Sequence, residues 1–209
     1  MGNVEAIEGI IIDITSQKMK QDEISFLSYN DALTGIYNRL SFEIETKRLD
    51  KQQYFPLSVL IGDINGLKLV NDAFGLSKGD NVIIDTAKLL KKSLTNSDLI
   101  FRIGGDEFAI LMPNTNEKEA LERFESITNN IIEYNNNVSN ETLHVNISLG
   151  FATKNSEEED FANIIKIAED YMYKRKLFES KSSHSTILAS IRTTMNERCE
   201  ETEQHAERL

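Results

Sequence analysis

Two apolar runs around a Gly-Gly turn constrain the fold of this chain more than any other feature. Leu99–Ile103 and Phe108–Met112 enclose the four residues Gly104–Glu107. Two glycines between such runs are typical of a β-hairpin, and glycine permits positive φ angles at the turn. The hairpin would present two consecutive carboxylates, with no glycine side chain to keep another molecule away. A polar surface hairpin whose acids serve solubility is the alternative interpretation.

The order of the other elements predicts an α+β fold. We expect strands over 57–64, 99–103, 108–112 and 144–150, and helices over 16–30, from 67, from about 80, over 116–136 and over 157–178. Such an order favours a mostly antiparallel sheet with helices packed against it. Prolines occur only at Pro56 and Pro113, and no low-complexity run interrupts the chain. We therefore expect one domain over residues 31–189.

Composition excludes several classes of function. The 209 residues include 34 Asp and Glu against 23 Lys and Arg, which gives a net charge of −11 and argues against nucleic acid as a partner. No apolar run approaches the roughly 18 residues of a spanning helix, so we expect no membrane contact. Cys199 is the single cysteine and cannot form an internal disulfide. A reducing, cytoplasmic compartment is the default expectation.

Asp63 stands at the polar end of the apolar segment Leu57–Gly62. A carboxylate there is costly unless it lies at the rim of the sheet or is bound to something. If this strand lies beside the hairpin, Asp63 converges with Asp106 or Glu107. Carboxylate oxygens at a strand end suit Mg²⁺, and two such ions assist phosphoryl or nucleotidyl transfer. The pattern therefore indicates metal-assisted phosphate chemistry.

Three polar residues that follow Asp63 in the sequence could recognise a nucleotide. Lys68 could neutralise phosphate, while Asn71 with Asp80 offers the amide and carboxylate that suit guanine. The alternative is that Asn71 and Asp80 merely cap two successive helices. The chain has neither a P-loop motif nor a G-x-G-x-x-G motif, so a nucleotide would bind by another scheme.

Three ordered motifs together resemble those of GGDEF-domain diguanylate cyclases. They are Asp31–Arg39 (DALTGIYNR), Asp63–Asp72 (DINGLKLVND) and Arg102–Phe108 (RIGGDEF), spread over a region of about 160 residues. The resemblance implies a nucleotidyl-cyclase palm of the ferredoxin-like type, with the GGDEF motif on a β-hairpin. It also implies the condensation of two GTP molecules into cyclic di-GMP and pyrophosphate, with Mg²⁺ or Mn²⁺, across a homodimer in which each subunit presents one GTP.

The resemblance also implies roles for individual residues. Asp106 would be the base for the ribose 3′-hydroxyl, and Glu107 would assist at the same site. Lys176 has an alternative explanation, because a basic residue near a helix end is favoured by the helix dipole. The implied metal ligands are Asp63, the Ile64 carbonyl, Asp106 and Glu107, and the implied substrate-binding residues are Lys68, Asn71, Asp80, Gly104, Gly105 and Lys176.

The chain also departs from the family pattern. Asn65 stands where many members have aspartate, Leu76 where many have histidine, and residues 180–182 replace a Gly-Arg-Asn stretch, with Lys181 as the nearest substitute. The inhibitory product site of the family needs an Arg-x-x-Asp motif before the hairpin. Here Thr95 replaces the arginine that would clamp a phosphate, so we predict no tight product inhibition through Asp98.

Both ends of the chain resemble parts of neighbouring domains. Residues 1–30 would hold the last strand of a PAS domain, Gly9–Thr15, and a signalling helix, while residues 190–209 would begin an HD-GYP domain. Glu201 and His205 would share a helix face there, although an exposed helix explains them as well. An alternative function follows, namely a catalytically weak GTP-binding domain that controls an HD-GYP phosphodiesterase. The sequence leaves open the upstream signal, the resting oligomeric state and the net synthesis or degradation of cyclic di-GMP.

Overall fold

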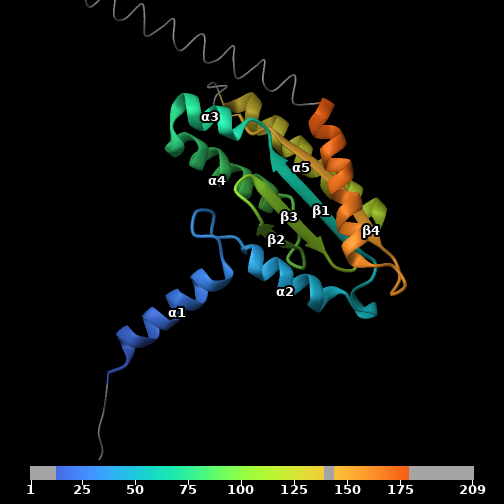
Figure 1. Cartoon of the computed structure of the whole chain (residues 1–209), viewed down its shortest axis with the longest axis horizontal. Coiled ribbons are helices and arrows are strands. Elements are labelled where there is room, and N and C mark those ends of the chain that lie inside the picture. The colour runs from blue at the N-terminus through green and yellow to red at the C-terminus, as the bar shows by residue number, and fades with distance from the viewer. Residues whose placement is uncertain (1–12, 139–143, 179–209) are drawn as a thin grey trace, which may run out of the picture.

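The protein is built around a four-stranded sheet with the strand order β2-β3-β1-β4. The computed structural model describes residues 13–138 and 144–178. β1 (Leu57–Ile64) is central and pairs antiparallel with β3 (Glu107–Met112) on one side and with β4 (Ile147–Lys154) on the other. β2 (Leu99–Arg102) pairs antiparallel with β3 (Figure 1). The mostly antiparallel sheet flanked by helices, with the GGDEF motif on a hairpin, is confirmed.

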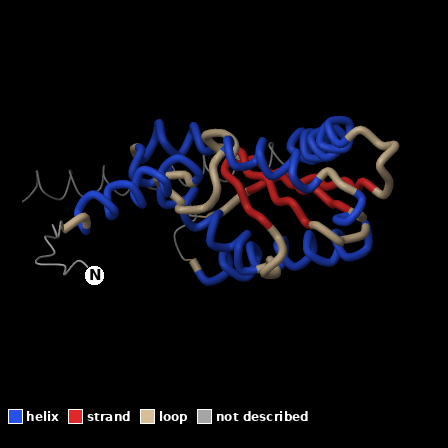
Figure 2. Tube along the Cα trace, turned by 90° about the horizontal axis from the view of Figure 1, so that it is seen from below, coloured by secondary structure: helices blue, strands red, loops and turns tan. Residues whose placement is uncertain are grey.

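Helices cover both faces of the sheet, as Figure 2 shows. One face packs on α3 (Leu67–Phe74), α4 (Leu76–Lys92) and α5 (Glu117–Asn137) through a core that includes Leu60 and Ile110. The other face packs on α2 (Arg39–Leu49) and the helix 161–178, through a core that includes Val59 and Phe101. All eight residues of β1 are buried, as expected for a central strand covered on both sides. A 3₁₀ turn, Gln52–Tyr54, leads from α2 toward β1.

The helix 161–178 lies directly against β4 at Gly150. A Cβ atom on Gly150 would overlap the carbonyl oxygen of Ala168 and the amide nitrogen of Met172. Only glycine permits so close an approach between helix and strand. This contact fixes the distance and register of the helix on the sheet, and thereby the position of its last two turns.

β4 and the last helix both begin later than predicted, and local hydrogen bonds explain the two late starts. β4 also continues to Lys154, whereas the prediction ended it at residue 150. β4 begins at Ile147 instead of residue 144, because the Asn135 side chain bonds both the N–H and the C=O of Val145 and ties this segment to α5. The last helix begins at residue 161 instead of 157. The carboxylate of Glu159 accepts from two preceding backbone N–H groups and closes a turn there.

The other predicted helices are confirmed with small shifts. α3 and α4 are separated by Gly75 alone, whose φ of 85° lets it end one helix and begin the next, so α4 starts at Leu76 and not near residue 80. α5 begins after Asn116, which forms a reciprocal capping box with Glu119.

The helix predicted over residues 16–30 is present as α1 (Thr15–Tyr29), which projects from the rest of the molecule (Figure 1). Its apolar residues Met19, Phe26 and Leu27 are exposed. Most of the predicted PAS strand and all of residues 190–209 lie outside the described residues. In the part of the chain that the structure describes, no helix has both the length and the hydropathy needed to cross a membrane.

Candidate active site

The end of β1 and the GGDEF hairpin meet as the sequence predicts. Asp63 pairs in register with Glu107, and the Ile64 amide donates to the carbonyl oxygen of Asp106 at 3.0 Å. Directly opposed residues of an antiparallel pair point to the same face of the sheet. The carboxylates of the two strands are therefore brought to one rim.

The hairpin turn uses its glycines differently from the prediction. Positive φ angles occur at Gly35, Gly66 and Gly75, but not at Gly104 or Gly105. The Glu107 side chain folds over Gly104, where a Cβ would collide with it, whereas a Cβ on Gly105 would meet open space. Gly104 therefore leaves room for the Glu107 side chain, and Gly105 leaves the outer surface of the turn unhindered. Neither glycine adopts a positive φ angle.

Arg102 links the hairpin turn to Asp31 through hydrogen bonds, a role that was not predicted from the sequence. Its guanidinium donates to the Gly105 carbonyl at 2.7 and 3.2 Å and to both carboxylate oxygens of Asp31 at 3.0 and 3.2 Å. Thr34 donates to Asp31 through its amide and its hydroxyl. Burial by itself would raise the pKa of Asp31, but the hydrogen bonds from Thr34 and Arg102 outweigh it and hold the pKa below its usual value. The available signals were an arginine at the end of an apolar strand and the place of Asp31 and Arg102 as the first residues of two motifs.

Asp63 is paired with Lys176, which lies 113 residues away in the sequence. The Nζ atom of Lys176 is 2.6 Å from Oδ1 of Asp63, and Asp63 is only 8% exposed. Burial raises the pKa of Asp63 above its ordinary value, and the negative charge of Asp106 adds to this rise, whereas Lys176 opposes it. The helix 161–178 thus supplies a cation to the rim of the sheet.

A pocket of about 500 Å³ opens beside these groups. The predicted site residues Ile64, Lys68, Asp106 and Lys176 line it, and so does Asp72, whose role the sequence analysis did not consider. Within residues 13–138 and 144–178, no three His, Cys, Asp or Glu side chains are placed to hold a metal by themselves. A cation here would need backbone carbonyl oxygen and substrate phosphate oxygen in addition to carboxylates. Glu107 is exposed and does not line this pocket.

Asn71 and Asp80 lie together but outside that pocket. The Asn71 side chain packs against Gly79 so tightly that a Cβ there would overlap it, and Asp80 follows in the first turns of α4. Oδ1 of Asn71 is buried and accepts no hydrogen bond from the described residues. Neither residue occupies an N-cap position, since Gly66 and Gly75 precede the two helices. The capping alternative is therefore wrong.

The departures from the family pattern have structural consequences. Asn65 exchanges hydrogen bonds with the Ser148 hydroxyl on β4, and Leu76 is 73% exposed at the start of α4. The side chain of Asp98 is fully buried and accepts hydrogen bonds from Thr95 N and from Arg123 Nε. Both bonds go to Oδ2, whereas Oδ1 is buried and has no hydrogen-bond partner among the described residues. A carboxylate buried in this way is poorly placed to bind a product. The absence of tight product inhibition stays a prediction.

Chemically, this rim can bind a polyanion together with cations. Two carboxylates and one backbone carbonyl are hard oxygen ligands, and two lysines can neutralise phosphate charge. A chain with a net negative charge repels phosphate. Cations attracted by Asp63 and Asp106 would offset that repulsion at this rim.

Known proteins resemble this chain in sequence and in fold. A family model described as diguanylate cyclase, GGDEF domain, matches residues 28–182. The YhcK protein of Bacillus subtilis, described as uncharacterized, is 33% identical over 172 residues, which cover 80% of this chain and 48% of YhcK. Diguanylate cyclase DgcM of Escherichia coli K12 is 32% identical over 172 residues, which cover 80% of this chain and 40% of DgcM. The chain thus spans less than half the length of these two relatives.

Solved structures with the same fold come from other bacteria. The coiled coil and GGDEF domain of DgcB from Caulobacter crescentus, in complex with c-di-GMP, matches with a TM-score of 0.67 at 23% identity, over 78% of this chain and 88% of that one. Diguanylate cyclase SiaD of Pseudomonas aeruginosa, in complex with its activator SiaC, matches with a TM-score of 0.65 at 25% identity, over 77% and 64% of the two chains.

Proposed function

Because the chain belongs to the GGDEF family of diguanylate cyclases, we propose that it condenses two GTP molecules into cyclic di-GMP and pyrophosphate across a homodimer. The pairing of Asp63 with Glu107, next to an intact GGDEF turn, is the observation that supports this function best. Each subunit would bring one GTP, whose ribose 3′-hydroxyl attacks the α-phosphate of the other. Residues 31–189 would form the catalytic domain and act in the cytoplasm, between PAS-like and HD-GYP-like neighbours.

The rim carboxylates would hold the divalent cations and handle the proton. Asp63, the Ile64 carbonyl and Asp106 suit Mg²⁺ or Mn²⁺ because all three present oxygen, and Glu107 lies next to them. The cation, when bound, would lower the pKa of the attacking hydroxyl and neutralise charge on the leaving pyrophosphate. Asp106 would accept the proton of the 3′-hydroxyl, with Glu107 assisting. Lys176 would exchange its contact with Asp63 for the triphosphate.

Substrate binding would extend from the hairpin to α3 and α4. Lys68 lines the pocket beside Asp106 and would meet phosphate. Gly105, where a Cβ would meet open space, would let the nucleotide approach the turn, and Gly104 would do so once the Glu107 side chain that covers it moves away. The buried oxygen of Asn71 would accept a hydrogen bond from guanine, whose N1 and exocyclic amine are donors, and Asp80 would accept a second one. A buried acceptor without a partner costs free energy, so a ligand that satisfies it gains affinity.

A regulatory GTP-binding domain that controls an HD-GYP phosphodiesterase is the second candidate. It is favoured by the ion pair between Lys176 and Asp63, which occupies a proposed metal ligand, and by the exposed Leu76 where many members have histidine. Such a domain would bind GTP without converting it.

Incubation of the purified protein with GTP, ATP and Mg²⁺, with products identified by mass, separates these functions. Cyclic di-GMP from GTP alone is the expected result. GTP that binds but stays unchanged at high protein concentration would favour the regulatory domain, and a product containing adenosine would indicate another dinucleotide synthase.

A further inference from the structure

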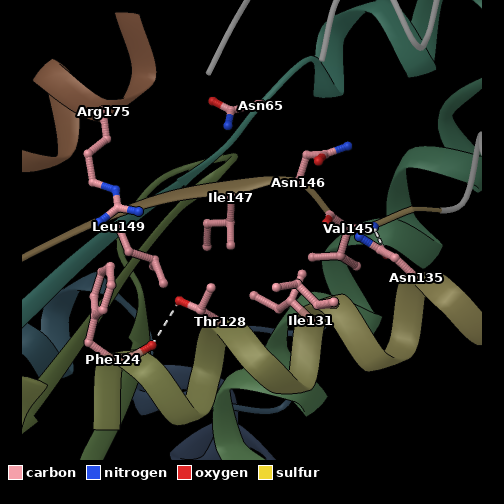
Figure 3. Close-up of a pocket in the computed structure, with 11 residues that line it drawn as sticks. Asn65, Phe124, Thr128, Ile131, Asn135, Val145, Asn146, Ile147, Leu149 and Arg175 are labelled. Carbon is pink, nitrogen blue, oxygen red and sulfur yellow. Dashed lines mark hydrogen bonds between the residues drawn. The ribbon is translucent and has the colours of Figure 1, made fainter. Parts of the chain in front are cut away.

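A second pocket lies behind the candidate active site, between α5, β4 and the helix 161–178. Figure 3 shows this pocket, which has a volume of about 270 Å³. The residues that line it are Asn65, Phe124, Thr128, Ile131, Ile132, Asn135, Val145, Asn146, Ile147, Leu149 and Arg175. Its size suits a ligand smaller than a nucleotide, because nucleotide and drug sites usually fall in the range of about 300–1,000 Å³.

The lining contains one cation and no carboxylate. Arg175 reaches down from its helix, and its guanidinium carbon lies 4.7 Å from the centre of the Phe124 ring. Ile131, Val145 and Leu149 contribute apolar walls. The chain has a net charge of −11, so a pocket lined by an arginine and by no acid is unusual in it. Such a pocket favours a negatively charged ligand.

Three polar side chains of the pocket are already bonded to the protein, among them Thr128, whose hydroxyl donates to the Phe124 carbonyl oxygen. The Asn135 amide bonds both backbone groups of Val145, and the Asn65 amide is bonded to the Ser148 hydroxyl. Arg175 offers five N–H donors, so it can bind a carboxylate in addition to a protein partner. A planar ring could lie on the apolar walls while its carboxylate meets this guanidinium.

From this lining we propose that the pocket binds a small planar aromatic carboxylate, held by Arg175 and the apolar walls, and that its occupancy alters the active site. Neighbouring residues connect the two sites. Lys176, next to Arg175 on the same helix, contacts Asp63, and Asn65 follows Asp63 by two residues on the strand end. A ligand that shifts Arg175 or Asn65 would therefore also shift Lys176 or Asp63. These two residues are the proposed triphosphate and metal ligands. The effect on synthesis rests on the proposed function, whereas binding does not.

Binding is tested with benzoate on the whole chain, without GTP, by isothermal titration and by ligand-observed NMR. Ligands of this size bind in the micromolar to millimolar range, so the titration extends to about 10 mM. We expect saturable binding of benzoate, and at least about tenfold weaker binding of the neutral isostere benzamide, because the charge-assisted hydrogen bonds are lost. No saturable binding, or equal binding of the two probes, would overturn the proposal.

Two variants locate the site. Arg175→Gln should weaken benzoate at least about tenfold, while Lys174→Gln removes the same charge one position earlier, outside this pocket, and should leave binding unchanged. Thr128→Leu adds volume inside the pocket, retains Arg175 and should also abolish binding. Thermal unfolding confirms that each variant is folded. Benzoate binding that survives both Arg175→Gln and Thr128→Leu would place the ligand elsewhere and refute this site.

The connection to the active site has its own readout. Saturating benzoate is expected to change the KM for GTP by about fivefold or more in the wild type and to leave it unchanged in Arg175→Gln. An unchanged KM in a wild type that binds benzoate would refute the connection but not the pocket. Benzoate binding by a protein that never converts GTP would contradict the proposed function and leave the pocket standing.

Discussion

Lys176 contacts Asp63 across 113 residues of the chain. The sequence allows two interpretations of this lysine. The family resemblance implies that it binds triphosphate, whereas its place near a helix end is also favoured by the helix dipole. The structure places its ammonium group 2.6 Å from Asp63, at the rim where phosphate chemistry is proposed. The dipole does not explain this contact, because a charge that only complemented the helix end would not need a carboxylate partner.

We therefore predict that Lys176→Gln raises the KM for GTP at least about tenfold, because a charge-assisted contact to phosphate is lost. Steady-state kinetics on GTP measure this change. Lys174→Gln, which removes a charge stacked near Tyr171, is the matched control and should behave like the wild type. Equal effects of the two substitutions would mean that only net charge matters.

A second residue-level prediction concerns Asp31, which supports Arg102 beneath the hairpin. Its pKa is lowered in the folded protein, so its charged form stabilises the fold at neutral pH, and this contribution is lost as the pH falls through the folded pKa. Asp31→Asn should lower the free energy of unfolding by about 1 kcal/mol at pH 7, since the carboxylate is partly exposed.

Urea unfolding of wild type and Asp31→Asn across a range of pH measures this difference. The two proteins should converge as the pH drops below 3.8, the ordinary pKa of the carboxyl group. A difference that stays constant with pH would show that Asn disturbs packing instead of removing a charge.

At the scale of elements, the hairpin and β1 could be predicted because their patterns are local. Continuous apolar runs and a Gly-Gly turn predict the strands, and a lone acid at a strand end predicts the rim. The contact of Arg102 with Asp31 spans 71 residues, and no periodicity signals it. The start of β4 was missed for a similar reason, since the Asn135 side chain that delays it belongs to α5, a separate element.

The packing of the helix 161–178 on β4 gives a prediction for Gly150. Gly150→Ala should lower the free energy of unfolding by about 3 kcal/mol, because the added methyl group meets the helix backbone at Ala168 and Met172, which cannot move aside like a side chain. Gly105→Ala is the matched control, since a Cβ there meets open space, and its stability should equal that of the wild type. Chemical denaturation of both variants decides the point, and equal stabilities would contradict the close approach of helix and strand.

At the scale of the whole molecule, the proposed reaction needs two subunits. One rim offers one set of carboxylates and one nucleotide pocket, whereas the product contains two guanosines. The exposed apolar residues of α1 are available for pairing with a second chain. A pairing of two chains could not be predicted from residue patterns alone, because exposed apolar residues on α1 also suit a single connector helix.

Specific activity should therefore rise with protein concentration until the dimer is saturated. Initial rates over a wide dilution series, together with the mass in solution at each concentration, measure this dependence. Constant specific activity in a protein that remains monomeric would contradict the requirement for two subunits.

The central claim is that the carboxylates at this rim drive cyclic di-GMP synthesis. The most direct measurement quantifies, by mass spectrometry, the product formed from GTP and Mg²⁺ by wild type and by Asp106→Asn at equal, high concentration. We predict cyclic di-GMP from the wild type and none from the variant, while thermal unfolding shows both to be folded, since the rim residue Asp106 fills no core cavity. Full turnover by Asp106→Asn, or GTP left intact by the wild type, would contradict the account.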